Sequence, residues 1–340
     1  MSRPFTFYEF FAGGGMARLG LGAGWECLFA NDFDPGKAAA YRANFGGAHL
    51  STADIHSLGA ADLPGRADLA WASSPCQDFS LAGARAGLGG SRSSALLGFL
   101  ELMGELARKG RAPRMLVIEN VTGLLSARGG ADFAALRRSL AELGYAASAV
   151  TLDASAFLPQ SRPRVFVVAS AEGQTPPLPA PPIRALDLAE VLEPEAVWSS
   201  AEDTARLLSL LGPANGLKLN AALAAGERRV GAAYRRVRLE AGRRVQRLEL
   251  RFDGVAGCLR TPAGGSSRQF VIETQAGQVR SRRLTAREGA RLMGLPEDFA
   301  LPAGEMAAWR VVGDGVAVPV VAWLSRHVLE PALSSRTAAA

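Results

Sequence analysis

Short apolar runs alternate with stretches of helical spacing along the first 170 residues. Five runs combine apolar and β-branched or aromatic residues in the manner of strands, namely Phe5–Phe10, Glu26–Ala30, Ala67–Ala72, Met115–Glu119 and Val165–Ala169. Four intervening stretches have helical spacing, namely Met16–Leu21, Pro35–Asn44, Ser94–Arg108 and Asp132–Leu143. This alternation predicts a doubly wound α/β sheet with its ligand sites at the carboxyl ends of the strands.

The pattern breaks at residues 173–182, where five prolines fall within ten residues. Such a density excludes regular structure, so we predict a domain linker there. Residues 1–184 would form the first domain. Residues 283–330 would complete it, because helical spacing returns there and Val318–Leu324 is apolar enough to pack against the first domain. Residues 185–282 would form a smaller second domain, and residues 331–340 a tail.

The second domain contains an unusual concentration of arginine. Nine arginines occur between residues 228 and 251, at positions 228, 229, 235, 236, 238, 243, 244, 247 and 251. A solvated strand or helix face is one explanation. The alternative is a DNA-facing surface, because arginines separated by apolar residues suit strands that bury one side and present guanidinium groups to phosphates or guanine edges on the other.

Composition narrows the class of protein. A chain of 340 residues has room for two domains, and its net charge of +6 favours a polyanionic partner without deciding for one. No apolar run approaches the ~18 residues of a membrane span, so we expect a cytoplasmic protein. Three separated cysteines and three separated histidines indicate neither a disulfide framework nor a metal site.

A glycine cluster follows the first predicted strand. Gly13, Gly14 and Gly15 allow a tight turn and the close approach of a nucleoside cofactor, although many proteins place glycines there for packing alone. Asp32 ends the second strand about twenty residues later, where an acidic group commonly accepts hydrogen bonds from ribose hydroxyls, and Asp54 is a further candidate near an adenine. This arrangement suits a dinucleotide or S-adenosylmethionine equally well.

Three further segments at strand ends carry chemistry. Cys76 follows Pro75 directly after a predicted strand and leads into a loop rich in glycine, serine and arginine, which favours a nucleophile over an inert core cysteine. Glu119 ends a buried apolar strand, a position that suits a proton donor as well as a structural carboxylate. Arg162 and Arg164 flank a proline directly before a predicted strand. They belong to an ordinary solvated turn, or they place positive charges near Cys76 and Glu119.

In this order, the segments resemble the motif set of the cytosine-5 DNA methyltransferases over nearly the whole chain outside the variable region. The resemblance implies a Rossmann-like methyltransferase sheet in a catalytic and cofactor-binding domain of residues 1–184, completed by residues 283–330. It also implies a smaller target-recognition domain of residues 185–282, and S-adenosylmethionine as cofactor. The catalytic residues it implies are Cys76, Glu119, Asn120, Arg162 and Arg164. The cofactor-binding residues it implies are Phe11, Gly13, Gly15, Asp32, Phe33, Asp54, Ile55, Pro75, Asp314 and Val316.

Two positions depart from the family pattern. Ser73 and Ser74 precede Pro75 where the family usually has Gly-Phe, which alters local packing but leaves the nucleophile in place. Asp314, in the late motif GDGVAVPV, stands where the family usually has Asn, so a carboxylate replaces a neutral amide near the cofactor.

The resemblance implies methylation of carbon 5 of a cytosine flipped out of duplex DNA, through a covalent adduct with Cys76. Polar and basic side chains of the loop after Cys76 and of the second domain are the expected DNA contacts, namely Gln77, Ser80, Arg85, Arg92, Arg260, Thr261 and Arg268. We expect a monomeric restriction-modification or orphan enzyme without a metal. The alternatives are a transfer RNA methyltransferase built on the same motifs and a catalytically silent DNA-binding relative. A nicotinamide-dependent oxidoreductase would leave Cys76 and the arginine pair unused.

Overall fold

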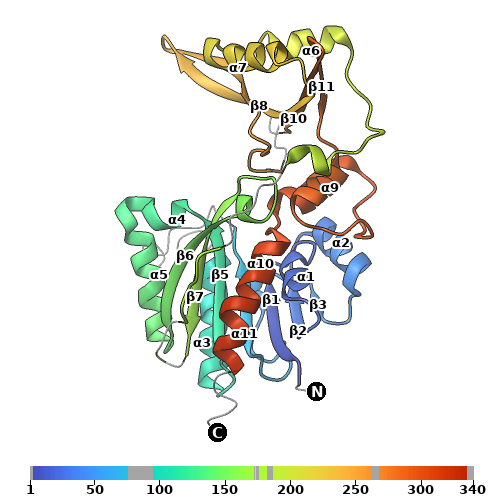
Figure 1. Cartoon of the computed structure of the whole chain (residues 1–340). Helices are drawn as coiled ribbons and strands as arrows, with labels where there is room; N and C mark the ends of the chain where they lie inside the picture. Colours follow the sequence, from blue (N-terminus) through green and yellow to red (C-terminus); the bar gives the residue numbers. More distant parts are fainter. Residues whose placement is uncertain are drawn as a thin grey trace. The chain divides into compact units, whose positions relative to one another are not determined.

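Two structural units, each with its own sheet, make up the chain (Figure 1). The computed structural model describes residues 3–75, 95–171, 173, 176–181, 187–261 and 268–334. Unit 1 comprises Met1–Asp153, Pro163–Pro181 and Val316–Ala340, and unit 2 comprises Ala154–Arg162 and Pro182–Gly315. Unit 2 is therefore an insertion into unit 1 along the sequence. The predicted domain boundaries at residues 184 and 283 were placed from sequence motifs, whereas the two units are defined by contacts between residues. The predicted boundaries therefore stay a prediction.

The seven-stranded sheet of unit 1 has the order β3-β2-β1-β4-β5-β7-β6. Its strands are β1 (Phe5–Phe10), β2 (Trp25–Asn31), β3 (Leu50–Ser51), β4 (Leu69–Ser73), β5 (Met115–Val121), β6 (Ala146–Asp153) and β7 (Pro163–Ser170). The pairs among β1–β5 are parallel, whereas β7 is antiparallel to both β5 and β6. The chain order reverses between β1 and β4, which is the switch point where α/β sheets bind ligands.

Helices lie on both sides of this sheet, so the doubly wound prediction is confirmed. They are α1 (Met16–Leu21), α2 (Pro35–Phe45), α3 (Ala95–Arg108), α4 (Gly123–Ser126), α5 (Ala131–Glu142), α10 (Val318–Leu324) and α11 (Glu330–Ser334), with short turns η1 (Ile55–Ser57), η3 (Ala127–Gly130) and η6 (Ser325–Leu329). Local sequence explains α2, which begins with Asp34 accepting hydrogen bonds from Gly36 N and Lys37 N and has Pro35 in its first turn. Each of the nine predicted elements is present within a few residues of its predicted bounds.

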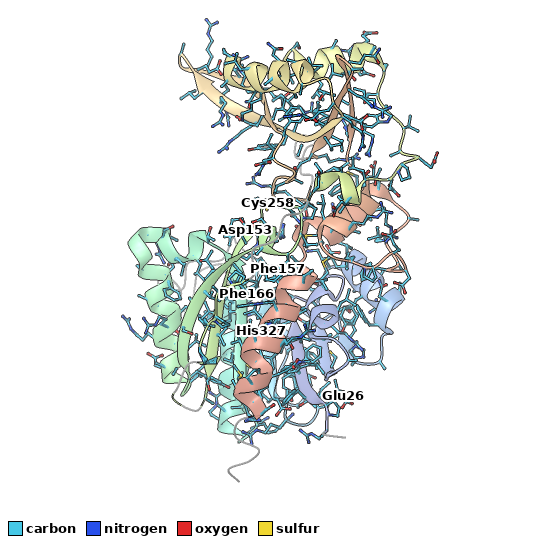
Figure 2. All side chains as sticks on the ribbon, viewed as in Figure 1. Glu26, Asp153, Phe157, Phe166, Cys258 and His327 are labelled. Carbon is cyan, nitrogen blue, oxygen red and sulfur yellow. The ribbon has the colours of Figure 1, made fainter. Side chains whose placement is uncertain are left out.

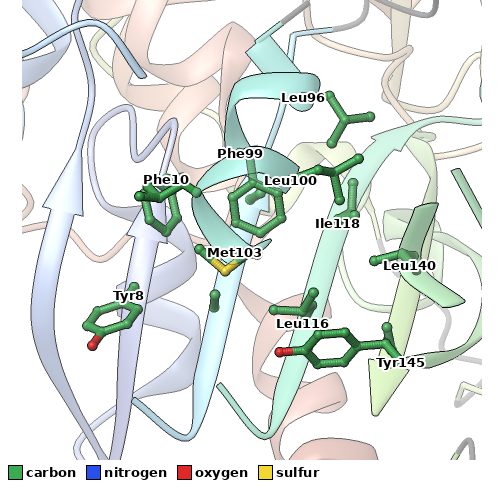
Figure 3. Close-up of a cluster of buried hydrophobic side chains, with 14 of the residues drawn as sticks. Tyr8, Phe10, Leu96, Phe99, Leu100, Met103, Leu116, Ile118, Leu140 and Tyr145 are labelled. Atoms are coloured by element: carbon green, nitrogen blue, oxygen red, sulfur yellow. The ribbon is translucent and has the colours of Figure 1, made fainter. Parts of the chain in front are cut away.

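Alternate strand residues supply the main core. Tyr8 and Phe10 of β1 and Leu116 and Ile118 of β5 point to one face, as the two-residue period of a strand requires. Figure 3 shows them packed against side chains of α3 and α5, among them Phe99, Leu100, Met103 and Leu140. This cluster holds the strands in register, and with them the positions of their carboxyl ends.

The opposite face of the sheet is covered by α1 and by the last helical segment of the chain. A Cβ on Gly20 of α1 would lie 2.5 Å from Cβ of Val321 in α10, so only glycine permits this approach. Trp25 Nε1 donates a hydrogen bond of 2.8 Å to Ser325 Oγ across 300 residues of sequence. The segment Val318–Leu324 therefore packs within unit 1.

One helical stretch of the described residues, Glu305–Ser334, is long and apolar enough to cross a membrane. It spans α9 (Glu305–Asp314), α10 and α11. More than half of its most apolar part, 56%, is buried inside the protein, so the stretch is explained as a core segment.

Unit 2 contains a four-stranded sheet of order β11-β10-β8-β9 with antiparallel neighbours. Its strands are β8 (Arg229–Glu240), β9 (Arg243–Arg251), β10 (Phe270–Gln275) and β11 (Gln278–Arg283). Its helices, besides α9, are α6 (Ala201–Leu208), α7 (Pro213–Ala224) and α8 (Ala286–Leu292), with short turns η4 (Ala154–Ala156) and η5 (Leu188–Val191). A small core joins Leu207 and Leu219 of the helices to Ala233, Leu248 and Leu250 of the hairpin β8–β9.

Candidate active site

The first candidate site element is the turn that follows β1. Phe11 has φ 56°, a left-handed conformation that costs a non-glycine residue energy, and Gly13 and Gly15 have φ values of 56° and 81°. A Cβ on Gly15 would lie 2.3 Å from the Phe45 ring, whereas a Cβ on Gly13 would meet nothing within 4 Å. The turn therefore needs glycine at Gly15 for packing and leaves space open at Gly13.

Asp32 lies beside this turn, because its neighbour Asn31 pairs with Phe10 at the ends of β2 and β1. Its Oδ2 accepts a hydrogen bond of 2.8 Å from Gly13 N, and its Oδ1 accepts one of 2.9 Å from Asp34 N. Burial raises the pKa of the Asp32 carboxyl, and the two backbone donors oppose that shift. Next to it, the Phe33 side chain is 68% exposed and presents its aromatic ring to solvent.

Asp54 and Ile55 lie at the start of η1, in the loop after β3. Asp54 Oδ1 accepts a hydrogen bond of 2.9 Å from His56 N, and Ile55 is buried. Sequence reasoning missed Asn31, whose Nδ2 donates to Ala53 O at 2.9 Å and Ser51 O at 3.2 Å. This amide ties the Asp54 loop to the end of β2, so the structure brings the predicted cofactor residues of the first three strands together.

Glu119 and Arg164 form an ion pair in unit 1. Register explains it: Arg164 of β7 lies opposite Val121 of β5, and Glu119, two residues earlier in β5, points to the same face. Arg164 Nε is 3.2 Å from Glu119 Oε1, and both side chains are largely buried, at 16% and 8% exposure. The arginine therefore fixes the carboxylate at the carboxyl end of a central strand.

Asn120 connects β5 with the end of β4. Its Nδ2 donates to Ser74 O at 3.2 Å and to Ser74 Oγ at 3.1 Å, in a buried environment. Ser74 thus has a structural partner at one of the positions that depart from the family pattern. Pro75 follows and is exposed. The predicted residues Cys76, Gln77, Ser80, Arg85 and Arg92 lie outside the described residues.

Arg162 belongs to unit 2, where its guanidinium contacts backbone carbonyl groups. Its Nη1 donates to Leu259 O at 2.9 Å, and its Nη2 donates to Gly313 O at 3.1 Å and Gly315 O at 2.7 Å. Gln160 reinforces this contact, because Leu259 N donates to its Oε1 at 3.1 Å. Arg162 therefore holds two distant segments of unit 2 together, a role not evident from its place in the sequence.

The remaining predicted residues of unit 2 lie near the hydrogen bonds of Arg162 or on the surface. Thr261 Oγ1 donates a hydrogen bond to Asp314 Oδ1, so the carboxylate that replaces the family's Asn has a hydroxyl partner. Arg260 is exposed, whereas Arg268 pairs with Glu305 and donates to Leu284 O at 3.3 Å. Val316, in unit 1, is buried. Among the described residues, no three His, Cys, Asp or Glu side chains are placed to hold a metal ion.

A buried polar cluster lies next to the glycine turn, between β1, α1 and α2. Sequence reasoning did not identify it. Glu9 of β1 is 1% exposed, and its Oε1 accepts a hydrogen bond of 3.2 Å from Arg18 N. Arg18 Nη1 donates in turn to Tyr41 Oη at 3.1 Å, and His49 Nε2 is 3.1 Å from the same oxygen. A charged residue inside an apolar strand was the available signal. Burial raises the pKa of Glu9 to about 8.

Replacing Glu9 by glutamine is expected to flatten the pH dependence of stability. Because the folded pKa is about 8 against an ordinary 4.5, the wild type loses free energy of unfolding as the pH rises from 4.5 to 8, by up to about 1.4 kcal/mol per unit. Glu9→Gln removes this slope. Denaturation between pH 5 and 8.5 measures it.

The difference in slope between the wild type and Glu9→Gln reports the titration of Glu9 alone. Burial lowers the pKa of His49, which adds a slope of opposite sign below pH 6.5 to the wild type and to the variant alike. The exposed Glu26 offers a matched control, since Glu26→Gln should leave the wild-type slope in place. Identical slopes for Glu9→Gln and the wild type would contradict the prediction.

Comparison with known proteins decides the family. Residues 5–330 match the sequence model of the family described as C-5 cytosine-specific DNA methylase. The chain belongs to this family. It is 27% identical over 342 residues to the type II methyltransferase M.DsaV of Dactylococcopsis salina, covering 96% of this chain and 86% of that protein. It is 25% identical over 350 residues to M.HpaII of Haemophilus parainfluenzae, covering 97% and 90%.

Solved structures show the same fold at lower identity. The methylase superposes on the Dnmt2 methyltransferase of S. pombe with a TM-score of 0.65 and 20% identity, covering 96% of this chain and 99% of that one. It superposes on the Entamoeba histolytica methyltransferase EhMeth with a TM-score of 0.69 and 14% identity, covering 98% and 100%. The predicted fold class and family are therefore confirmed.

C-5 cytosine methylases generally use S-adenosylmethionine, and the described residues of this methylase fit a nucleoside cofactor. The fit rests on the space beside Gly13, where a Cβ would meet no atom within 4 Å, and on the carboxylate of Asp32 next to it. The exposed ring of Phe33 adds a stacking surface.

Proposed function

We propose that this methylase transfers a methyl group from S-adenosylmethionine to carbon 5 of a flipped-out cytosine in a specific sequence of duplex DNA. The Glu119–Arg164 ion pair carries the proposal, since it fixes a carboxylate at the end of β5, beside the strand that leads to Pro75 and Cys76. The names of the bacterial relatives support a type II restriction-modification enzyme, and we infer a monomer acting on DNA in the cytoplasm.

Cys76 begins the reaction in this proposal. Carbon 5 of cytosine is a weak nucleophile, so the Cys76 thiolate first adds to carbon 6 and forms a carbon–sulfur bond. The electron pair displaced from the 5,6 double bond makes carbon 5 nucleophilic. Few free thiols are ionised at pH 7, and a cationic neighbourhood is needed to increase that fraction. Arg162 and Arg164 are the proposed sources of that charge.

Glu119 acts on the pyrimidine ring. Attack by Cys76 builds negative charge on the ring, and Glu119, in its protonated form, donates a proton to nitrogen 3 and neutralises this charge. Arg164 holds the carboxyl group in place for this transfer. S-adenosylmethionine, when bound, supplies the methyl group to carbon 5. A base, proposed to be a water molecule, then removes the carbon 5 proton. The carbon–sulfur bond breaks to release the Cys76 thiolate, and the proton on nitrogen 3 returns to Glu119.

The remaining predicted residues complete the proposal. Phe11, Gly13, Gly15, Asp32, Phe33, Asp54, Ile55, Pro75, Asp314 and Val316 would hold the cofactor. The cytosine leaves the duplex because the reacting atoms are inaccessible in a stacked helix. Gln77, Ser80, Arg85 and Arg92 would contact the flipped nucleotide and its phosphates, and Arg260, Thr261 and Arg268 the recognition sequence.

The test is transfer of labelled methyl groups from S-adenosylmethionine to mixed-sequence duplex DNA and, in parallel, to transfer RNA, with base-resolution mapping of the products. We expect methylation at carbon 5 of cytosine within one short duplex motif. Transfer to RNA alone would overturn the proposal in favour of a transfer RNA enzyme. Cofactor binding without transfer to either substrate would indicate a catalytically silent relative.

A further inference from the structure

The far half of the hairpin β8–β9 extends beyond the sheet of unit 2. Strand β10 pairs with β8 only between Arg229 and Ala233, whereas β8 and β9 stay paired up to Glu240 and Arg243. Residues 234–240 and 243–249, called the ribbon below, therefore form a two-stranded element, apart from one bridge between Leu248 and Leu211. It contains seven residue pairs, roughly 23 Å in length at the rise of a strand.

Local sequence explains the sharp tip of the ribbon. Ala241 and Gly242 form its two-residue connection, with φ values of 46° and 76°. Two positive φ values are typical of the turn type that matches the twist of a hairpin. Figure 2 shows side chains projecting into open space around this tip.

The ribbon is strongly basic. It contains six arginines and two glutamates, a net charge of +4 in fourteen residues. Arg238 Nε donates to Glu249 Oε1 at 2.8 Å, and Arg247 Nε donates to Glu240 Oε1 at 2.8 Å. Arg236, Arg243 and Arg244 form no ion pair within the described part of the chain. This excess of positive charge indicates a polyanionic partner.

Pairing register divides the ribbon into two chemically different faces, because residues directly opposite each other share a face. The helix-side face continues the core formed by Ala233 and Leu250, and it carries Arg235, Val237, Leu239, Arg244, Gln246 and Leu248. The outer face carries Tyr234, Arg236, Arg238, Glu240, Arg243, Val245, Arg247 and Glu249. Both carboxylates of the ribbon are therefore on the outer face.

The far end of the helix-side face is open to solvent. Val237 is 52% and Leu239 75% exposed, and Arg244 and Gln246 opposite them are exposed as well. Apolar side chains beside an arginine and a glutamine, with no carboxylate, match the chemistry of base edges. Arginine pairs with guanine, glutamine with adenine, and apolar groups contact the thymine methyl.

We propose that the ribbon enters the major groove of the target DNA with its helix-side face toward the bases, and that Arg244 and Gln246, flanked by Val237 and Leu239, determine part of the recognised sequence. A two-stranded ribbon fits the width of this groove. The ion-paired arginines of the outer face then point away from the bases. This inference rests on the proposed function and assigns sequence recognition to particular residues.

The experiment compares the exposed Arg244 and Gln246 with the half-buried Arg247 on the opposite face of the ribbon. Wild type, Arg244→Ala, Gln246→Ala and the control Arg247→Ala methylate a duplex library with randomised sequence, and base-resolution mapping gives the preferred motif of each. Arg244→Ala and Arg247→Ala remove the same charge from the same strand but from opposite faces. Unchanged thermal stability of each variant establishes that it folds, as expected for positions outside the core.

Arg244→Ala and Gln246→Ala are expected to lose discrimination at individual motif positions by about 5- to 150-fold, the range for one base contact. Arg247→Ala should keep the wild-type motif. If all three variants methylate the wild-type motif with undiminished discrimination, the ribbon does not read bases, and the proposed function still stands. If the wild type transfers no methyl group to duplex DNA, both proposals are wrong.

Discussion

Replacing Cys76 by serine is expected to lower the rate of methyl transfer by a factor of about 10⁴ or more. The serine hydroxyl ionises far less readily than a thiol and has no base assigned to it, so the attack on carbon 6 fails. Binding of S-adenosylmethionine and of DNA should persist, because the substitution removes no binding group. Single-turnover transfer of labelled methyl measures the first effect, and equilibrium titration measures the second.

Cys27 provides the matched control. It lies in β2, where burial raises the pKa of its thiol to about 12, so it stays protonated and unreactive. Cys27→Ser should therefore keep the wild-type transfer rate. Substantial methylation by Cys76→Ser would exclude Cys76 as the nucleophile.

Replacing Glu119 by glutamine is expected to lower kcat by a factor of about 10² to 10⁴, which is the usual contribution of a general acid. Glutamine keeps the size of the side chain but cannot transfer a proton to nitrogen 3. The nearby Arg164 stays available to hold the amide oxygen, since it approaches Oε1 at 3.2 Å in the wild type. KM for DNA should therefore change much less than kcat, and steady-state kinetics on the mapped motif measures both.

A surface carboxylate of unit 1 serves as the control for this substitution. Glu105 of α3 accepts hydrogen bonds from Ala60 N and pairs with Lys109, away from the strand ends. Glu105→Gln should leave kcat unchanged. If Glu119→Gln also leaves kcat unchanged, Glu119 has no role in proton transfer.

The site residues at the strand ends could be predicted from the sequence because they follow directly after apolar runs. Glu119 follows Met115–Ile118, and the glycine turn follows Phe5–Phe10, so placing the strands also placed the side chains. Strand β6 was missed because its sequence, AASAVTLD, is only weakly apolar, and seven of its eight residues are incompletely buried. Strand β3 has two residues and leaves no periodicity to detect.

Arg162 and Arg164 show where prediction from sequence ends. They are two residues apart and were assigned one role, yet their partners differ in kind. Arg164 pairs with the side chain of Glu119, whereas Arg162 donates to carbonyl oxygens of residues 97 to 153 positions away. Every residue carries a carbonyl group, so such partners have no signature in the sequence. For Glu9 the sequence shows a charged residue in an apolar strand, but not the cluster around it, whose other members come from α1, α2 and the loop before β3.

The insertion of unit 2 into unit 1 has a consequence for synthesis on the ribosome. Residues 3–153 emerge before the late segment of unit 1, yet Gly20 of α1 packs against Val321, and Trp25 of β2 donates a hydrogen bond to Ser325. The nascent chain must therefore keep this apolar surface exposed until residues 321–325 have been made. Contacts across 300 residues also slow folding, because a long loop must close before they form. Chaperone dependence during translation is thus expected to be greatest for unit 1, the part that begins first and finishes last.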